Sequence, residues 1–269
     1  MNSKKKWMMS GLLAFIMLAM VGCGSNNADS GKASEKIMFA SDASYAPMEY
    51  MDTDKIKGFD IDFIQAVMKE AGMDYEVKNT GWDTMLSSVK QGTEYQAGLS
   101  SVSITDERKE TYDYSIPYFE STNMIMVKEG SPIKSALDLK DKVVAVQTAT
   151  TADDLMSGIM GVDNSKLKRF DSNAVALMEL NGGGADAVVA DIAIIREYIK
   201  NNPDQKLTGI LDKTNFGSEY YGILLPKGSE LKAKLDPAIK KVLENGKYAE
   251  IYKTWFGEEP NTDNLLNAK

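Results

Sequence analysis

The feature that most constrains the fold is an alternation of short apolar strands and amphipathic helices, which begins at residue 36. In the first helix, which we expect to begin at Asp60, the apolar residues Phe63, Ile64 and Val67 recur at the spacing of one buried helical face. Strands joined by helices in this order form mostly parallel sheets with helices on both faces. We therefore expect an α/β protein with strands at 36–41, 75–78, 95–100, 142–146, 167–170 and 185–190 and helices at 60–71, 83–90, 151–160, 174–180 and 192–200.

The strands and helices fall into two units that share a local pattern of helix, glycine, short apolar strand and polar residue. In the first unit this pattern runs from Val89 to Ser101, and in the second it runs from Leu180 to Asp191. Open α/β sheets bind their ligands at the carboxyl ends of the strands. We therefore expect one ligand site in a cleft to which both units contribute.

The composition limits the chemistry of that site. The chain of 269 residues has no histidine and a single cysteine. This argues against Ser-His-Asp and Cys-His catalysis, against most zinc sites and against an internal disulfide. The formal net charge of −8 argues against nucleic acid as a partner and favours a cationic ligand. We expect neither a metal nor a cofactor.

The first residues have the pattern of an export signal. Three lysines precede an apolar stretch at 11–22 that is too short to span a membrane. The sequence Met-Val-Gly-Cys that ends at Cys23 resembles a bacterial lipoprotein processing site, although leucine is usual where Met20 stands. We expect a signal peptide at 1–22 and a flexible tether at 23–35 that is lipid-anchored through Cys23. The alternative is an ordinary signal peptide with an incidental cysteine.

The stretch SITDERKE at 103–110 combines hydroxyl groups with an arginine at an expected helix start. Ser103 can cap this helix, with Asp106 in a capping-box position. Acids in the first turn suit the helix dipole, whereas a cation does not. Arg108, beside the hydroxyls of Ser101 and Ser103, can instead bind a carboxylate through two parallel hydrogen bonds. The stretch is therefore either a solvated helix start or an anion site.

Three further positions have both a structural and a ligand-binding interpretation. The turn at 147–151 lies between a strand and a helix, where its amides and hydroxyls can cap the helix, bind an anion or do both. Asp191 follows an apolar strand and either caps the next helix or pairs with an ammonium group. Tyr45 and Trp82 are either core residues or, with Asp42, the walls of a slot for an aliphatic or cationic side chain.

Six segments keep the order and spacing of a known family: SDASYAPMEY, GFDIDF, SSVSITDERKETYDYSIPYF, VVAVQTATT, DAVVAD and GKYAEIYKTWFG. Across residues 36–257 the chain resembles the amino-acid-binding proteins of bacterial ABC importers. The resemblance implies a two-lobed periplasmic-binding-protein fold of type II, in which each lobe is a mostly parallel sheet flanked by helices. Two crossover strands, near 120–124 and 216–220, would form the hinge. Lobe 1 would then comprise 36–121 plus 218–269, and lobe 2 would comprise 122–217.

The resemblance also implies a role for each candidate residue. Arg108 would bind the α-carboxylate of the ligand, and Asp191 would bind its α-ammonium group. The rings of Tyr45 and Trp82 would enclose the ligand side chain. The other implied positions are the hydroxyl of Ser103, the backbone near Ser101, the amide of Thr151, the acids Asp42 and Glu49 at the far end of the pocket, Ser100, and Gln147 opposite them.

The acids Asp42 and Glu49, together with two aromatic faces, suit a long cationic side chain, and the chain is most similar to family members for arginine, lysine or histidine. The resemblance implies a monomer, lipid-anchored on the extracellular face of the bacterial cytoplasmic membrane. It would capture a free basic L-amino acid by lobe closure and deliver it to the permease subunits of an ABC transporter.

The alternatives are a binder of glutamine, cystine or another polar amino acid, a dehydratase of the same fold with Glu49 as general acid, and the binding module of a sensor. Two positions depart from the family pattern, namely Ile192 in place of asparagine and Ala149 in place of glycine.

Overall fold

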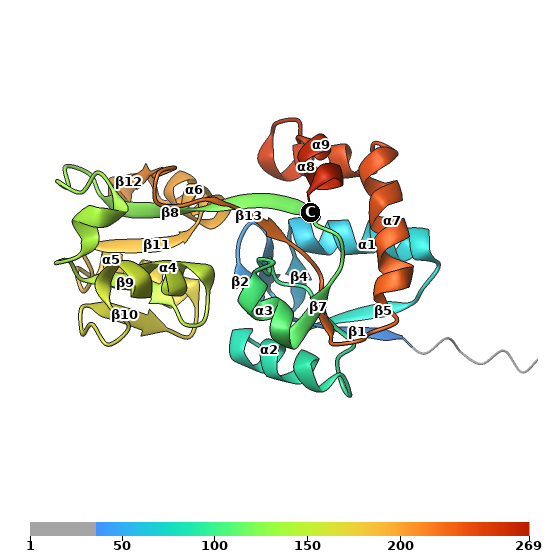
Figure 1. Cartoon of the computed structure of the whole chain (residues 1–269). Coiled ribbons are helices and arrows are strands. Elements are labelled where there is room, and N and C mark those ends of the chain that lie inside the picture. The colour runs from blue at the N-terminus through green and yellow to red at the C-terminus, as the bar shows by residue number, and fades with distance from the viewer. Residues whose placement is uncertain (1–35, 269) are drawn as a thin grey trace, which may run out of the picture. The chain divides into compact units, whose positions relative to one another are not determined.

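The computed structural model describes residues 36–268, which fold into two α/β lobes (Figure 1). In this part of the chain, no helix is long and apolar enough to cross a membrane. The expected signal peptide at 1–22 and the expected tether at 23–35, with Cys23, lie outside the described residues.

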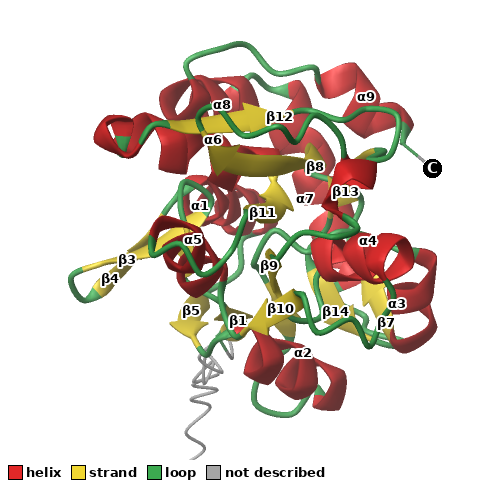
Figure 2. Ribbon diagram, turned by 90° about the vertical axis from the view of Figure 1, so that its left-hand side faces the viewer, coloured by secondary structure: helices red, strands yellow, loops and turns green. Residues whose placement is uncertain are grey.

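Lobe 1 is built on a five-stranded sheet in the order β5-β1-β6-β14-β7. Strand β1 is parallel to β5 and β6, whereas β14 is antiparallel to β6 and β7. A smaller antiparallel sheet, β2-β3-β4, contacts the same lobe, and its β3–β4 hairpin projects outward at the left of Figure 2. The strands are β1 (Ile37–Ser41), β2 (Ser44–Tyr45), β3 (Glu49–Asp52), β4 (Lys55–Lys57), β5 (Tyr75–Asn79), β6 (Ala97–Gly98), β7 (Tyr112–Tyr114) and β14 (Leu224–Pro226). The helices are α1 (Phe59–Ala71), α2 (Trp82–Gln91), α3 (Asp106–Thr111), α7 (Lys232–Glu244), α8 (Lys247–Phe256) and α9 (Thr262–Asn267).

Lobe 2 is built on a sheet in the order β10-β9-β11-β8-β12. Strand β9 is parallel to β10 and β11, whereas β8 is antiparallel to β11 and β12. The strands are β8 (Phe119–Lys128), β9 (Val144–Gln147), β10 (Leu167–Phe170), β11 (Ala187–Asp191) and β12 (Leu207–Ile210). The helices are α4 (Thr151–Met160), α5 (Asn173–Asn181), α6 (Ile192–Asn201) and the short 3-10 turns η1 (Ala136–Leu139) and η2 (Pro203–Gln205).

Two paired strands join the lobes. The chain passes from β7 of lobe 1 into β8 of lobe 2, and it returns through β13 (Ser218–Tyr221) to β14. Strands β8 and β13 are antiparallel, with Ser218 opposite Thr122 and Tyr221 opposite Phe119, and Figure 1 shows them side by side between the lobes. Such a connection is a hinge about which two lobes can open and close. The residue limits proposed for each lobe stay predictions.

An aromatic cluster fixes the hinge strands to lobe 1. Phe119, at the start of β8, packs against Phe59 and Tyr221, with ring centroids 5.3 Å apart in both pairs. Tyr118 stacks on Phe63 at 4.6 Å. Phe59 and Phe63 belong to the buried face of α1, which the apolar spacing of that segment predicts. Aromatic pairs add about 0.5–1.5 kcal/mol each beyond the burial of their area, so this packing sets the point from which both hinge strands leave lobe 1.

The structure confirms the predicted fold class and the succession of strands and helices. The five helices expected from the sequence begin and end within one residue of the predicted bounds. Both large sheets are mixed rather than mostly parallel, because the strands that cross or follow the hinge pair antiparallel with their neighbours. The strand expected at 95–100 is limited to β6, and the backbone has turned by Ser101, whose φ is 50°.

Candidate ligand-binding site

One cavity between the lobes is lined by all eleven residues that are predicted to bind a ligand. Lobe 1 contributes Asp42, Tyr45, Glu49, Trp82, Ser100, Ser101, Ser103 and Arg108, and lobe 2 contributes Gln147, Thr151 and Asp191. Five further residues line the same cavity. Thr150 belongs to the predicted turn at 147–151, and the sequence does not predict the other four, namely Asn123, Ala152, Asn173 and Ala190. The structure thus brings the predicted side chains together, while their contact with a ligand stays a prediction.

Arg108 reaches the cavity from α3 and bridges the two lobes. The N-cap of α3 is Thr105, whose hydroxyl accepts a hydrogen bond from the Arg108 amide. The predicted cap at Ser103 is wrong, because Ser103 instead pairs with Tyr221 in a β-bridge before the helix. The guanidinium donates to the carbonyl oxygens of Ser103 at 3.0 Å and of Ala149, in lobe 2, at 2.9 Å. Among residues 36–268 it forms no ion pair with a carboxylate, so its charge suits an incoming anion.

The indole of Trp82 supports this arginine. The guanidinium carbon of Arg108 lies 5.5 Å from the centre of the Trp82 ring, within the range of a cation–π contact. The indole nitrogen donates to the same Ala149 carbonyl at 3.3 Å. Ala149 itself has a φ of 57°, a conformation that glycine adopts more readily. Trp82 therefore holds the arginine as well as lining the cavity.

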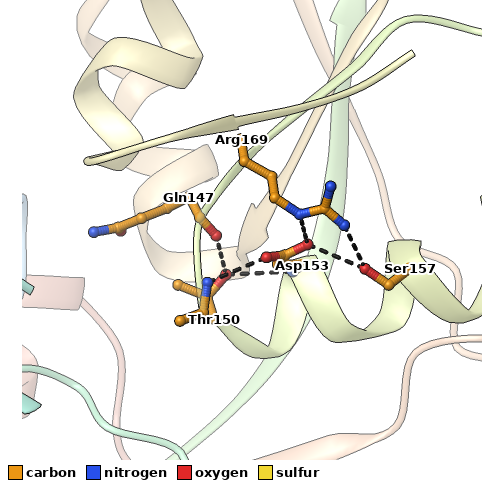
Figure 3. Close-up of polar contacts among 6 residues, drawn as sticks. Gln147, Thr150, Asp153, Ser157 and Arg169 are labelled. Carbon is orange, nitrogen blue, oxygen red and sulfur yellow. Dashed lines mark hydrogen bonds and ion pairs between the residues drawn. The ribbon is translucent and has the colours of Figure 1, made fainter. Parts of the chain in front are cut away.

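The turn that precedes α4 is held by the network in Figure 3. Thr150 is the N-cap of α4, because its hydroxyl accepts from the Asp153 amide at 3.3 Å and donates to the Gln147 carbonyl at 2.8 Å. The Asp153 carboxylate pairs with Arg169 at 2.8 Å and accepts from the hydroxyl of Ser157 at 3.2 Å. The capping interpretation of this turn is therefore confirmed at Thr150. The network fixes the backbone from which lobe 2 presents its polar groups.

Asp191, at the end of β11, supplies a carboxylate from lobe 2. It occupies the N-cap position of α6 but makes no capping hydrogen bond, so the capping interpretation is wrong. Its Oδ2 accepts a hydrogen bond from the Tyr45 hydroxyl of lobe 1, while Oδ1 is buried without a partner among the described residues. Burial and the charge of Glu219 raise the pKa of Asp191 to about 7, against the opposing effects of Tyr45, Tyr221 and Arg108. A cation beside it would favour the charged form.

Three more carboxyl groups cluster around Ser100 and Ser101. The Ser100 hydroxyl donates to Glu49 at 2.7 Å and accepts from the Asp42 amide at 3.0 Å. The Ser101 amide donates to Asp60 Oδ2 at 3.0 Å, and the Tyr118 hydroxyl donates to the same oxygen at 2.8 Å. Burial is the main cause that raises the pKa of all three, that of Glu49 well above its usual range and that of Asp60 to about 6. Among residues 36–268, no lysine or arginine forms an ion pair with Asp42, Glu49 or Asp60.

Gln147 connects the acid cluster to lobe 2. Its amide nitrogen donates to the Asp42 carboxylate at 3.0 Å, across the lobe boundary. Its amide oxygen accepts from Asn173 at 2.6 Å, and this fixes which end of the amide faces Asp42. An amide donor satisfies one carboxylate oxygen but brings no positive charge, so the acid cluster keeps its preference for a cation.

Several polar residues in or beside this cavity are not predicted from the sequence. Asp60 was expected only to begin a helix, yet it is fully buried and contacts Ser101 and Tyr118. Asn123 is 1% exposed on β8, and Asn173 begins α5. The signal that could have identified Asp60 is an acid placed between two phenylalanines in GFDIDF, because a charged residue in such an apolar context is costly unless paired.

A polar cavity lined from two α/β lobes, which paired hinge strands connect, defines the class of two-lobed solute-binding proteins. Residues 37–258 match the model of the family described as bacterial extracellular solute-binding proteins, family 3. The chain belongs to this family.

Similar proteins in this family carry names for basic amino acids. The chain is 36% identical to a probable histidine-binding protein of Neisseria gonorrhoeae, over 95% of this chain and 97% of the relative. It is 30% identical to the arginine-binding extracellular protein ArtP of Bacillus subtilis, over 95% and 99% of the two chains. A solved structure of the arginine-, lysine-, histidine-binding protein ArtJ from Geobacillus stearothermophilus is 52% identical, with a TM-score of 0.84 over 87% of this chain and 100% of that one. Other relatives are named for glutamine or L-cystine.

The raised pKa of Asp191 predicts how the free energy of unfolding depends on pH. The pKa of this carboxyl group is higher in the folded than in the unfolded protein. The free energy of unfolding should therefore fall as pH rises from about 4 to about 7. Asp191→Asn removes this titration while keeping an acceptor oxygen for Tyr45. As pH rises between these two values, we expect the free energy of unfolding of the variant to increase by on the order of 2–4 kcal/mol relative to that of the wild type.

Urea denaturation at several pH values, without added ligand, measures this difference. Asp54→Asn, in the exposed β3–β4 turn, makes the same charge change away from the cavity and reports its general effect. Parallel stability curves for the wild type and Asp191→Asn would contradict the assignment of a raised pKa to Asp191.

Proposed function

We propose that this protein captures a basic L-amino acid, such as arginine, lysine or histidine, between its lobes and delivers it to an ABC importer. The observation that carries the proposal is the placement of Arg108 and Asp191 on one cavity, from opposite lobes. Among residues 36–268, the first is a guanidinium with no carboxylate partner, and the second is a buried carboxylate with one free oxygen. An amino acid carries a carboxylate and an ammonium group that pair with these two charges, and pairing compensates the cost of desolvating them.

The acid cluster supports a cationic ligand side chain. Asp42, Glu49 and Asp60 are buried, and burial without a cation opposes their ionisation. A guanidinium, ammonium or imidazolium group supplies the missing charge, and the rings of Tyr45 and Trp82 suit its alkyl or planar part. Several relatives are named as binding proteins for histidine or arginine, which agrees with this ligand class.

Lobe closure is the proposed mechanism of capture. Tyr45 and Asp191, and also Gln147 and Asp42, are hydrogen-bonded across the lobe boundary. A ligand that contacts both lobes makes its full set of contacts only when the cleft is shut, so it shifts the hinge equilibrium towards the closed form. The permease would then distinguish the loaded protein by the relative position of its lobes.

We further infer that the protein binds its ligand without transforming it. A dehydratase of this fold would need Glu49 as a general acid that donates its proton to substrate. Here Glu49 is 0% exposed, and its oxygens accept hydrogen bonds from Ser100 and Ser101. The relatives named for histidine and arginine are likewise binding proteins, which supports capture without chemistry.

The proposed location is the extracellular face of the cytoplasmic membrane, where the protein would act as a monomer. After removal of residues 1–22, lipid on Cys23 would anchor the chain through the tether at 23–35. The support is the position of the one cysteine of the chain, directly after an apolar segment of signal-peptide length.

A thermal-shift panel of the twenty amino acids and cystine tests the ligand class. A ligand at one hundred times its dissociation constant stabilises the folded state by about 2.7 kcal/mol, which raises the melting temperature of a chain of this size by roughly 5–10 °C. We expect arginine, lysine or histidine to produce this rise. A rise with glutamine or cystine alone would favour those alternatives, and a rise with acidic or apolar amino acids alone would contradict the acid cluster as a specificity element.

Arg108→Ala should abolish high-affinity binding of the amino acid. The substitution leaves the ligand carboxylate buried without a partner, at a cost of about 3–5 kcal/mol. Isothermal titration with L-arginine measures the change. Lys109→Ala is the matched control, because Lys109 lies on the same helix and is exposed in an ion pair with Asp106. Near-wild-type affinity in Arg108→Ala would contradict its role as the carboxylate ligand.

Cys23→Ser should release the protein from the membrane. We expect the wild type to incorporate radiolabelled palmitate and to sediment with membranes, and the variant to remain unlabelled and soluble, because a serine has no thiol to receive the lipid. Ser25→Ala is the control for a general defect in export. Equal labelling of the wild type and Cys23→Ser would contradict the proposed anchor.

A further inference from the structure

Glu219 lies on the hinge behind the cavity and contacts three residues that line it, and neither the sequence patterns nor the family resemblance points to it. It lies on β13, opposite Ser121 of β8. Its Oε2 accepts hydrogen bonds from the hydroxyls of Ser103 at 2.6 Å and Thr151 at 2.8 Å. Its Oε1 accepts from the amide nitrogen of Asn123 at 2.5 Å. One carboxylate thus binds a residue of lobe 1, a residue of lobe 2 and a residue of the other hinge strand.

These bonds determine what the two hydroxyls can do in the cavity. A hydroxyl has one proton to donate and two lone pairs with which to accept. Ser103 and Thr151 both donate their proton to Glu219, so they can only accept hydrogen bonds from a ligand. Thr151 also accepts from Asn123 at 3.3 Å, which leaves it one lone pair.

Glu219 also fixes the orientation of Asn123. Because the amide nitrogen of Asn123 faces this carboxylate, its Oδ1 faces elsewhere, and it is buried without a partner among the described residues. Asn123 is directly opposite Asp191 in the β8–β11 ladder, so the two side chains share one face of the sheet. Asp191 Oδ1 is likewise buried and unpartnered in that part of the chain. Acceptor oxygens without donors are therefore gathered beside two hydroxyls that can only accept.

We propose that Glu219 is a positioning residue for ligand binding. It accepts the hydrogen bonds that Ser103 and Thr151 can donate, and it orients Asn123. These three residues and Asp191 then form a subsite that consists of hydrogen-bond acceptors only. Such a subsite binds a group with several N–H donors and a positive charge. On the proposed function, on which this inference rests, that group is the α-ammonium of the amino acid. The carboxylate of the ligand is then left to Arg108 and backbone amides, and the hydroxyls take no part in binding it.

The simpler role for Glu219 is to tie the hinge to both lobes. A residue with that role alone would affect every ligand equally when it is replaced. A residue that orients acceptors affects only ligands that carry the ammonium group. The two roles therefore differ in a ratio of affinities, which a change in fold stability does not imitate.

The test compares three ligands on the wild type and Glu219→Gln by isothermal titration. L-Arginine has both charged groups, agmatine keeps the amine and lacks the carboxylate, and 5-guanidinovalerate keeps the carboxylate and lacks the amine. We expect Glu219→Gln to lower the affinity for L-arginine and for agmatine roughly 10- to 100-fold, which corresponds to the loss of charge-assisted hydrogen bonds. Binding of 5-guanidinovalerate should change less than about 3-fold. An equal loss for all three ligands, or a loss confined to 5-guanidinovalerate, would overturn the proposal.

A double-mutant cycle separates orientation of the hydroxyls from the mere charge of Glu219. In a Ser103→Ala/Thr151→Val background there is no hydroxyl to orient, so the effect of Glu219→Gln on L-arginine should shrink to about a third of its value in the wild type or less. Full additivity would mean that Glu219 acts by charge alone, and the proposal would fail.

Glu120→Gln is the matched control for all these measurements. Glu120 lies on the other hinge strand, opposite Tyr220, and accepts a hydrogen bond from Asn264 outside the cavity. The Glu120→Gln variant should bind all three ligands as the wild type does, and melting temperatures should show that every variant is folded. A wild type that binds no amino acid would refute the proposed function itself and this inference with it, whereas tight binding with an equal loss for the three ligands refutes only the role of Glu219.

Discussion

The arrangement of this cleft depends on the cost of burying a charge without a partner. Each lobe carries polar groups that its own residues do not satisfy. Tyr45 of lobe 1 donates to Asp191 of lobe 2, and Gln147 of lobe 2 donates to Asp42 of lobe 1. These bonds are neutral donors on carboxylates, so they orient the acids without neutralising them. The hinge, the aromatic cluster at its base and the turn before α4 all serve to bring such groups to one place.

The fold was largely predictable because its signals are local. The spacing of Phe63, Ile64 and Val67 predicts a helix with one buried face, and glycines at the ends of α1 and α2 adopt the left-handed conformation that terminates a helix. What the pattern did not predict is the direction of the strands that cross or follow the hinge. Strand direction depends on which segments pair across the whole chain, and periodicity within one segment carries no such information.

The cavity was predictable where its residues lie in sequence motifs, and not where they lie elsewhere. Arg108 stands beside hydroxyls in SITDERKE, and the structure places it on the cavity with no ion pair among the described residues. Its cap, however, is Thr105 and not Ser103, since the β-bridge of Ser103 to Tyr221 comes from a strand more than one hundred residues away. Asn123 and Glu219 belong to hinge strands with no marked local pattern. Their importance arises only from the pairing of β8 with β11 and β13.

The balance of charge in the cleft is the physical argument for the basic ligand of the proposed function. Of the described side chains that line the cavity, Arg108 is the one cation, and Asp42, Glu49 and Asp191 are the acids. A neutral amino acid pairs its two charges with Arg108 and Asp191 and leaves the acid cluster as it was. A basic amino acid brings one further positive charge to that cluster, where burial has raised the pKa of the carboxyl groups. Its side chain therefore gains an interaction that a neutral side chain of the same length cannot make.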